Sequence, residues 1–475
     1  MITENDSQRR AASYTCTGVN IVLISTYELG RQPFGLASPA AWLRKRGHTV
    51  VCLDLSRQAL DEASLRAAEL IAFYVPMHTA TRLALQLVEP LRRLNPAAQF
   101  CAYGLYAPLA EKSFRRRGVE FLFGGEFEEG LARLADRLAK RDDAVDAGAS
   151  EREKIISLAR QHFEVPDRSS LVPLRQYAHL VLPSGEHRTA GYTEASRGCK
   201  HLCKHCPIVP VYNGVFRIVD RETVLADIRQ QLGAGALHIT FGDPDFFNGI
   251  GHALAILEAM HHEFPLLTYD ATIKVEHLKK HEKYLSVLRD TGCLLVTSAV
   301  ESLDDEVLAK LEKGHTRDDF VHVVLKFREI GLTLQPTFVP FMPWTTLDSF
   351  RDLLETLNEL ELADAVSPIQ LGIRLLIPAG SRMLELEDVQ NIIGPFDEVA
   401  LVHPWRHRDP RVDALCEEIQ EIVASGEQLK RGRGATFERI WKAAQGAAGQ
   451  TAKLNTMPVL AARAAVPYLN EPWYC

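Results

Sequence analysis

The sequence lacks several signatures, and each absence excludes a class of protein. No apolar run approaches the roughly 18 residues that a membrane-spanning helix requires, so no membrane partner is expected. Neither a G-x-G-x-x-G motif nor a P-loop is present, which argues against a bound dinucleotide or nucleoside triphosphate. Basic residues are not in excess, because the chain has 54 Lys and Arg and 61 Asp and Glu. The formal net charge of −7 therefore gives no reason to expect nucleic acid as a partner.

The nine cysteines do not suit a disulfide framework, because their number is odd, their spacing is irregular and the chain is long, at 475 residues. Cys52, Cys101 and Cys293 lie in apolar stretches and are expected to be small buried side chains. The N-terminal apolar run from residue 19 to 24 predicts a strand and not the core of a signal peptide. We therefore expect a cytoplasmic protein.

Short apolar runs alternate with amphipathic segments from residue 20 to 139. The helical segments include Thr79–Leu94 and Glu126–Ala139, and the runs that predict buried strands are NIVLIS, TVVCLDL, LIAFYVP, QFCAYGL and EFLFGG. This alternation is typical of an α/β domain with a doubly wound parallel sheet, here over residues 18–140. Residues 141–189, which are charged and then punctuated by proline, predict a linker.

A second alternating series follows the linker. Its predicted strands are GYTEASRG, ALHITFG, LTYDATIKV, CLLVTSAVES, LTLQPTFVPF and IQLGIRLLIP, and its predicted helices are Arg221–Leu232, Ile250–His262, Lys279–Thr291, Asp318–Ile330 and Leu347–Leu360. A complete eight-stranded barrel has about 250 residues. Six units therefore predict a partial (β/α)6 barrel over residues 190–380, followed by a mainly helical C-terminal region over residues 381–475.

Three cysteines lie close together in RGCKHLCKHCP, directly after the first strand of this barrel. Loops that follow strands form the active-site face of a β/α barrel. Iron–sulfur clusters usually take four cysteine thiolates, so Cys199, Cys203 and Cys206 would leave one iron open to another ligand. The alternative is a zinc site completed by His201 or His205, although zinc sites usually draw on a second ligand pair that is not seen here.

This C-x-x-x-C-x-x-C loop, placed after the first of six β/α units, resembles the radical S-adenosylmethionine (radical SAM) superfamily. Two further segments match the family in position: TFGDPDFFN, where the family holds the SAM amino group, and SAVES, where it contacts the ribose. The resemblance implies a [4Fe–4S] cluster on the three cysteines and SAM contacts from Gly242, Asp243, Asp245, Glu301 and Ser302. Asp243 could instead shape a turn or cap a helix, and Glu301 could be a first-turn acid.

The resemblance implies that SAM is cleaved reductively to a 5′-deoxyadenosyl radical, which abstracts hydrogen from an unidentified substrate. An electron donor such as flavodoxin or ferredoxin is then an expected partner. Two alternatives stay open: a cobalamin-dependent radical SAM methyltransferase, and a non-catalytic iron–sulfur or zinc-binding protein.

The N-terminal domain resembles the cobalamin-binding domains of the B12-binding class of radical SAM enzymes. The D-x-H-x-x-G signature that supplies a cobalt ligand is absent, so no cobalt ligand is named. His78, Tyr103 and Tyr106 follow predicted strands, where they either face a corrin or are surface loop residues. Cobalamin is therefore an open cofactor alternative.

The last residues, YLNEPWYC, resemble a radical SAM (seleno)protein group whose tail reads Cys-Sec-Ala-Glu-Pro or Cys-Cys-Ala-Glu-Pro (CUAEP or CCAEP). We hypothesise that the chain continues past Cys475 through a selenocysteine codon; the alternative is an ordinary terminus.

The substrate cannot be deduced from the sequence. Lys274 and Arg374 either point into the barrel toward a ligand or form structural ion pairs. Aromatic and basic residues that could border the barrel mouth, or else be packing and solvated residues, are Trp344, Trp405, Arg406, Arg408 and Arg411.

Overall fold

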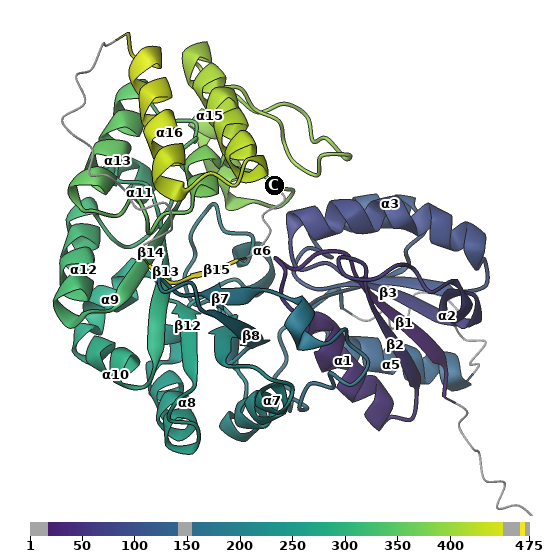
Figure 1. Cartoon of the computed structure of the whole chain (residues 1–475). Coiled ribbons are helices and arrows are strands. Elements are labelled where there is room, and N and C mark those ends of the chain that lie inside the picture. The colour runs from purple at the N-terminus through teal and green to yellow at the C-terminus, as the bar shows by residue number, and fades with distance from the viewer. Residues whose placement is uncertain (1–17, 141–153, 450–465, 471–475) are drawn as a thin grey trace, which may run out of the picture.

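A computed structural model describes residues 18–140, 154–449 and 466–470. Most strands belong to two sheets that lie beside each other (Figure 1). One sheet is formed by the N-terminal part of the chain, and the other carries the cysteine loop. In the described part of the chain, no helix is both long and apolar enough to cross a membrane.

The first sheet is parallel throughout, with the strand order β2-β1-β3-β4-β5-β6. Its strands are β1 (Asn20–Ser25), β2 (Thr49–Asp54), β3 (Leu70–Tyr74), β4 (Gln99–Tyr103), β5 (Phe121–Gly125) and β6 (Ile156–Ser157). All five predicted strands are present, and the doubly wound α/β fold is confirmed.

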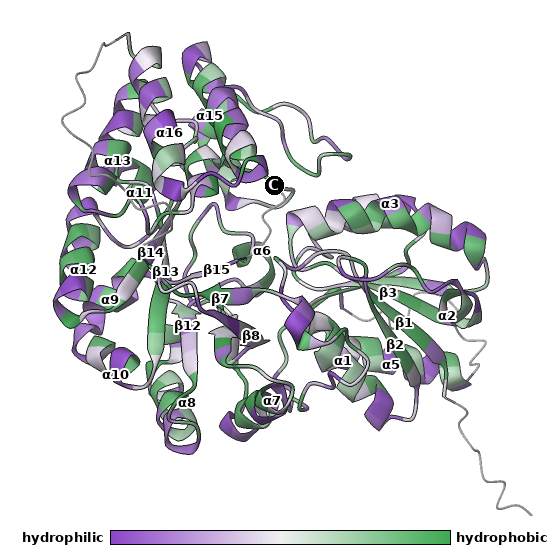
Figure 2. Ribbon diagram, viewed as in Figure 1, coloured by the Kyte–Doolittle hydropathy of each residue, from purple (hydrophilic) through white to green (hydrophobic). Residues whose placement is uncertain are grey.

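Helices cover both faces of this sheet. Helices α1 (Phe34–Lys45) and α5 (Glu128–Lys140) pack on one face, and α2 (Glu62–Ala67), α3 (His78–Leu94) and α4 (Glu111–Arg116) pack on the other (Figure 1). The strands are mostly hydrophobic along their length in Figure 2, because a sheet covered on both faces buries successive side chains.

The second sheet is a half-barrel with the order β14-β13-β12-β11-β8-β7-β15. Its parallel strands are β8 (His187–Thr193), β11 (His238–Phe241), β12 (Thr268–Thr272), β13 (Cys293–Glu301) and β14 (Thr333–Phe338). Two short antiparallel strands, β7 (His179–Val181) and β15 (Tyr468–Leu469), extend it beyond β8. A separate two-stranded ribbon joins β9 (Ser196–Gly198) and β10 (Phe216–Ile218).

The outer face of the half-barrel packs against helices. Ile239, Tyr269 and Val296 belong to its core, whereas the next residue along each strand faces the inner side, because side chains alternate along a strand. The surrounding helices are α7 (Arg221–Gly233), α8 (Ile250–Glu263), α9 (Val275–Lys280), α10 (Leu285–Asp290), α11 (Asp305–Lys310), α12 (Arg317–Ile330) and α13 (Leu347–Glu359).

Three predicted elements differ from the structure. The first barrel strand, GYTEASRG, is divided, because β8 ends at Thr193 and Ser196–Gly198 pairs with β10 in the separate ribbon. The sixth strand, IQLGIRLLIP, is a 3-10 helix over Pro368–Gly372 followed by a single bridge between Phe341 and Arg374. The Arg374 side chain there pairs with Asp413. The helix predicted at Lys279–Thr291 is two helices, α9 and α10, since the polar residues between them offer nothing to bury against the sheet.

The segment predicted as a linker, residues 141–189, contributes strands to both sheets. β6 pairs with β5, and β7 pairs with β8. The C-terminal region is mainly helical, with α14 (Glu387–Gln390), α15 (Pro410–Gln428) and α16 (Arg433–Ala447). Its last described residues form β15, and Cys475, with the predicted selenocysteine continuation, lies outside the described residues.

Candidate functional site

The three clustered cysteines lie on one loop between β9 and α6 (Val209–Tyr212), at the carboxyl ends of the barrel strands. Gly198 starts this loop with φ 72°, and a Cβ there would lie 2.3 Å from the Tyr212 ring. Only glycine suits this position, because other residues rarely adopt a positive φ. Inside the loop, the Cys206 amide donates to the Cys203 carbonyl at 3.2 Å, which folds the second and third cysteines into a turn.

The three thiols are close enough to influence one another. Burial raises the pKa of Cys206 to about 12, and the nearby charges of Cys203 and Cys199 contribute to the increase. All three are free thiols, and Cys203 is buried. If all three were deprotonated, the thiolates would repel one another, so a bound cation would favour their ionised form.

Two buried lysines supply positive charge beside this loop. Lys274 Nζ lies 3.8 Å from Cys203 Sγ. Lys313 is 3% exposed, and although burial opposes its charge, Glu301 and the Cys203 thiolate raise its pKa. From the sequence, Lys274 was expected either to contact a ligand or to form an ion pair. In the structure, Lys274 Nζ also lies 3.3 Å from Glu276 Oε2. Lys313 was missed, because nothing in its local sequence shows that it folds back toward the cysteines.

Glu301 ends β13 in a left-handed conformation, with φ 71°, beside an irregularity in the register with β14. Its Oε1 accepts hydrogen bonds from His205 Nε2 at 3.0 Å and Lys313 Nζ at 3.2 Å. Burial opposes ionisation, but the charges of Lys313 and His205 lower the pKa of Glu301 well below its usual range. A positive φ in a non-glycine residue at the end of a barrel strand is typical of a functional position. Glu301 is therefore held ionised beside the cysteine loop.

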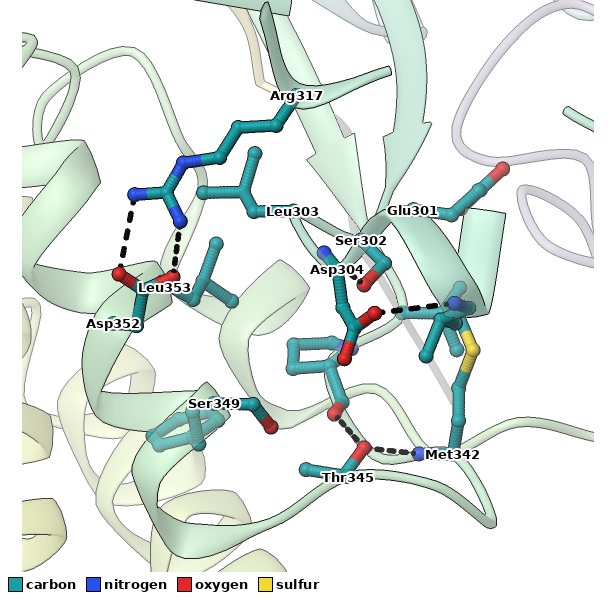
Figure 3. Close-up of a pocket in the computed structure, with 14 residues that line it drawn as sticks. Glu301, Ser302, Leu303, Asp304, Arg317, Met342, Thr345, Ser349, Asp352 and Leu353 are labelled. Carbon is teal, nitrogen blue, oxygen red and sulfur yellow. Dashed lines mark hydrogen bonds and ion pairs between the residues drawn. The ribbon is translucent and has the colours of Figure 1, made fainter. Parts of the chain in front are cut away.

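Ser302 and Glu301 border a pocket of about 230 Å³ between the ends of β13 and β14 and the start of α13 (Figure 3). The Ser302 hydroxyl accepts a hydrogen bond from the Asp304 amide at 3.1 Å. Arg317 and Asp352 form an ion pair at the far side, and the Glu301 carboxylate points away from the other lining side chains. This pocket is smaller than the 300–1,000 Å³ typical of ligand sites.

Asp243 bonds to the chain just before the cysteine loop. Its carboxylate accepts from the Ala195 amide at 2.9 Å and the Ser196 hydroxyl at 2.5 Å. Burial raises the pKa of Asp243 to about 7 although these hydrogen bonds favour its ionised form. Gly242, the preceding residue, packs against Tyr192, and a Cβ there would lie 1.9 Å from the Tyr192 Oη.

Asp245 connects the cysteine loop to α9. Its Oδ2 lies 2.7 Å from His277 Nδ1 and 3.6 Å from His201 Nε2. Burial opposes ionisation, yet hydrogen bonds and charge from these two histidines lower the pKa of Asp245 below its usual range. His277 was not identified from the sequence, because it reaches Asp245 from a different helix.

The two histidines of the loop contact side chains outside it. His205 pairs with Glu301, and the His201 ring packs against His277 with centroids 4.8 Å apart. The ligand atoms of Cys199, His201 and Asp245 do lie within 4.8 Å of one another, which is a different donor set from the one that the zinc alternative assumed. A metal there would compete with His277 for Asp245.

Other residues singled out in the sequence have structural roles. Arg374 pairs with Asp413 at 2.6 Å and lies 3.7 Å from the centre of the Trp405 ring. Trp344 donates its indole N–H to Asp388. Arg411 pairs with Asp409, two residues before it, and both Arg406 and Arg408 are exposed.

The side chains suggested for a corrin are committed to protein contacts. His78 Nε2 lies 2.6 Å from the Ala400 carbonyl oxygen, and burial lowers the pKa of His78. The Tyr103 hydroxyl donates to the Gly35 carbonyl at 2.9 Å, and Tyr106 is buried. Tyr103 and Tyr106 are buried, so they are not the surface loop residues that the alternative described.

Known proteins resemble this chain in sequence. Residues 193–357 match the Radical SAM superfamily. The ribosomal protein uS12 methylthiotransferase RimO of Azoarcus sp. (strain BH72) is 24% identical over 287 residues, covering 51% of this chain and 60% of that protein. The threonylcarbamoyladenosine tRNA methylthiotransferase MtaB of Bacillus subtilis (strain 168) is 20% identical over 307 residues, covering 60% and 61%. The chain thus spans about three fifths of the length of these relatives.

Solved structures share the fold over a larger part of the chain. The cobalamin-dependent S-adenosylmethionine radical enzyme OxsB, with aqua-cobalamin and S-adenosylmethionine bound, has a TM-score of 0.68 at 16% identity, covering 86% of this chain and 67% of that one. The radical S-adenosylmethionine methyltransferase TsrM of Kitasatospora setae has a TM-score of 0.59 at 18% identity, covering 77% and 75%. The cysteine loop, the half-barrel and the sequence match agree: residues 193–357 of this chain are a radical SAM domain.

Proposed function

We propose that this chain is a radical SAM enzyme in which Cys199, Cys203 and Cys206 hold a [4Fe–4S] cluster. The observation that carries the proposal is the gathering of three free thiols and two buried lysines at the carboxyl ends of the barrel strands. This donor set suits a cluster, because thiolate ligands are anionic and the lysines offset their charge. When bound, the reduced cluster supplies the electron that cleaves SAM and so provides a 5′-deoxyadenosyl radical for hydrogen abstraction.

The protein's own residues position SAM. Glu301 has one carboxylate oxygen occupied by His205 and Lys313, and its Oε2 is available to accept hydrogen bonds from ribose hydroxyls. Asp243 and Asp245 hold the loop from its two sides, so their contribution is to fix where the thiols lie. Gly242 and Ser302 border this region, Gly242 through its close packing on Tyr192.

A second candidate is a cobalamin-dependent methyl transfer on the same domain. The fold likeness to the cobalamin-bound OxsB covers 86% of this chain and so extends into the first sheet. No cobalt ligand is named for this candidate, because the D-x-H-x-x-G signature is absent from the sequence. In either candidate the electron comes from a small reductant such as flavodoxin or ferredoxin.

The test is SAM cleavage by the full chain, reconstituted anaerobically with iron and sulfide and reduced with dithionite. We expect 5′-deoxyadenosine from the unchanged protein and none from Cys206→Ala. Cys293→Ala is the matched control, because Cys293 is a buried thiol on β13 that is not part of the loop, and this variant should keep the activity.

Zinc in place of iron in the purified protein, with no iron uptake on reconstitution, would contradict the proposal and favour a zinc-binding protein. A fully loaded cluster that never cleaves SAM would favour the non-catalytic iron–sulfur alternative. Methylated product that depends on added hydroxocobalamin would favour the second candidate.

A further inference from the structure

A cavity of about 470 Å³ lies against the inner face of the half-barrel. Its floor is polar, because Thr240, Asp270 and Thr297 face inward on three neighbouring strands while the residues before them pack against the outer helices. Gly242, at the end of β11, also lines it, so the cavity reaches the strand end where the cysteine loop is anchored. Its volume suits a small molecule.

The C-terminal region closes this cavity. Strand β15 pairs with β7 at the edge of the sheet, and the Pro467 carbonyl accepts a hydrogen bond from Gln335 Nε2 at 2.6 Å. The turn between α15 and α16 forms a further wall, where Arg433 lies 4.5 Å from the centre of the Tyr468 ring. These walls lie outside residues 193–357, the part that matches the family.

The cavity is cationic although the chain is acidic. Four basic side chains line it against two carboxylates, Asp270 and Glu427; the basic residues are Arg31, Lys430, Arg431 and Arg433. Asp270 is already used internally, because its Oδ1 accepts from His238 Nε2 at 2.9 Å and Thr240 Oγ1 at 2.6 Å. The formal charge of the whole chain is −7, so this excess of positive charge is local.

Arg431 has a buried guanidinium nitrogen that lacks a hydrogen-bond acceptor in the part of the chain that the structure describes. Among the described residues, no acceptor bonds its guanidinium, and its Nη1 is buried. A buried guanidinium nitrogen without an acceptor costs free energy, which an anionic ligand would recover through a charge-assisted hydrogen bond. Arg433 donates Nη1 to the Asp364 carbonyl at 2.9 Å, which fixes the second guanidinium in the same wall.

We propose that this cavity binds a small anionic substrate, whose carboxylate or phosphate group is bound by Arg431 and Arg433. This inference rests on the proposed function, because it takes the barrel interior as the place where hydrogen abstraction occurs. The anionic end then lies at the α15–α16 turn, and the uncharged part points toward Gly242 and the cysteine loop. Arg431 and Arg433 select the substrate by its charge.

Binding of simple probes to the reconstituted full chain tests this without any turnover. We expect phenyl phosphate or benzoate to bind in isothermal titration calorimetry, and benzyl alcohol, which has the ring without the charge, not to bind. Arg431→Gln should weaken binding of the charged probe about tenfold, the value of one charge-assisted hydrogen bond. The affinities of phenyl phosphate and benzoate are then compared. The tighter of the two shows whether the site prefers a phosphate or a carboxylate.

Arg433→Gln is the second variant, and Arg411→Gln is the matched control, because Arg411 is an exposed arginine outside the cavity. Equal affinity in Arg431→Gln, Arg433→Gln and the control would overturn the proposal, as would binding of benzyl alcohol as tight as that of the anions. Failure of the charged probes to bind protein that cleaves SAM would also overturn it, while leaving the proposed function intact.

Discussion

At the scale of single residues, Arg197 is the most connected charge near the cysteine loop. It lies two residues before Cys199 and is buried, with Nη2 2.7 Å from Glu128 and Nε 2.7 Å from Glu194. Its Nη1 lies 3.5 Å from Glu126, whose pKa burial raises to about 7. Glu126 and Glu128 belong to the first domain, so one guanidinium joins that domain to the root of the loop.

Replacing Arg197 should therefore destabilise the whole chain. Arg197→Ala leaves the buried Glu126 and Glu128 and the half-buried Glu194 without their shared partner, and we expect the free energy of unfolding to fall by about 3–5 kcal/mol. Urea denaturation of the apoprotein measures this. Arg197→Lys should recover only part of the lost free energy of unfolding. Lysine keeps the positive charge, but its ammonium cannot reach three carboxylates as a guanidinium fork does.

Arg229→Ala is the control, since Arg229 pairs with Glu263 at the surface and its removal should leave the urea midpoint unchanged. Equal midpoints for Arg197→Ala and Arg229→Ala would show that the buried network contributes nothing to stability.

At the scale of elements, the contact between β8 and the end of β11 sets the geometry below the cysteine loop. Gly242 follows β11, and a Cβ there would lie 1.9 Å from the Tyr192 hydroxyl and 2.1 Å from its ring carbon. Backbone and ring are thus packed without room for a methyl group. Asp243, the next residue, depends on this packing for its bonds to Ala195 and Ser196.

Gly242→Ala should consequently lower the free energy of unfolding by about 1–3 kcal/mol, the usual cost of overpacking a core. Gly251→Ala, in the first turn of α8, is the matched control, because nothing lies within 4 Å of a Cβ there. Alanine is the better helix former, so the control should be unchanged or gain up to about 1 kcal/mol. A Gly242→Ala protein as stable as the control would contradict the packing argument.

At the scale of the whole molecule, the sequence predicted what depends on local pattern. Five of the six strands of the first sheet, five parallel strands of the half-barrel and the position of the cysteine loop follow from short apolar runs and from spacing. The contacts that join the domains could not be predicted. Arg197 meets Glu128 across 69 positions, and His78 meets Ala400 across 322.

The C-terminal region shows the same limit. The helices of this region were expected from the sequence. The sequence did not predict that Leu401 is buried in the core of the first domain. It also did not predict that Arg431 and Arg433 line the barrel cavity. Lys313 likewise reaches Glu301 only through the fold, since the loop after α11 carries no motif of its own. Tertiary contacts of single charged side chains leave no periodic signal in a sequence.

The central claim is that three thiols of one loop hold a cluster with an iron open to SAM. The most direct measurement is the electron paramagnetic resonance spectrum of the reconstituted, dithionite-reduced full chain, recorded with and without SAM. We expect a [4Fe–4S] signal whose g-values shift when SAM is added, and no such signal from Cys199→Ala or Cys203→Ala. A signal that survives in those variants, or one that SAM leaves unchanged, would contradict the account.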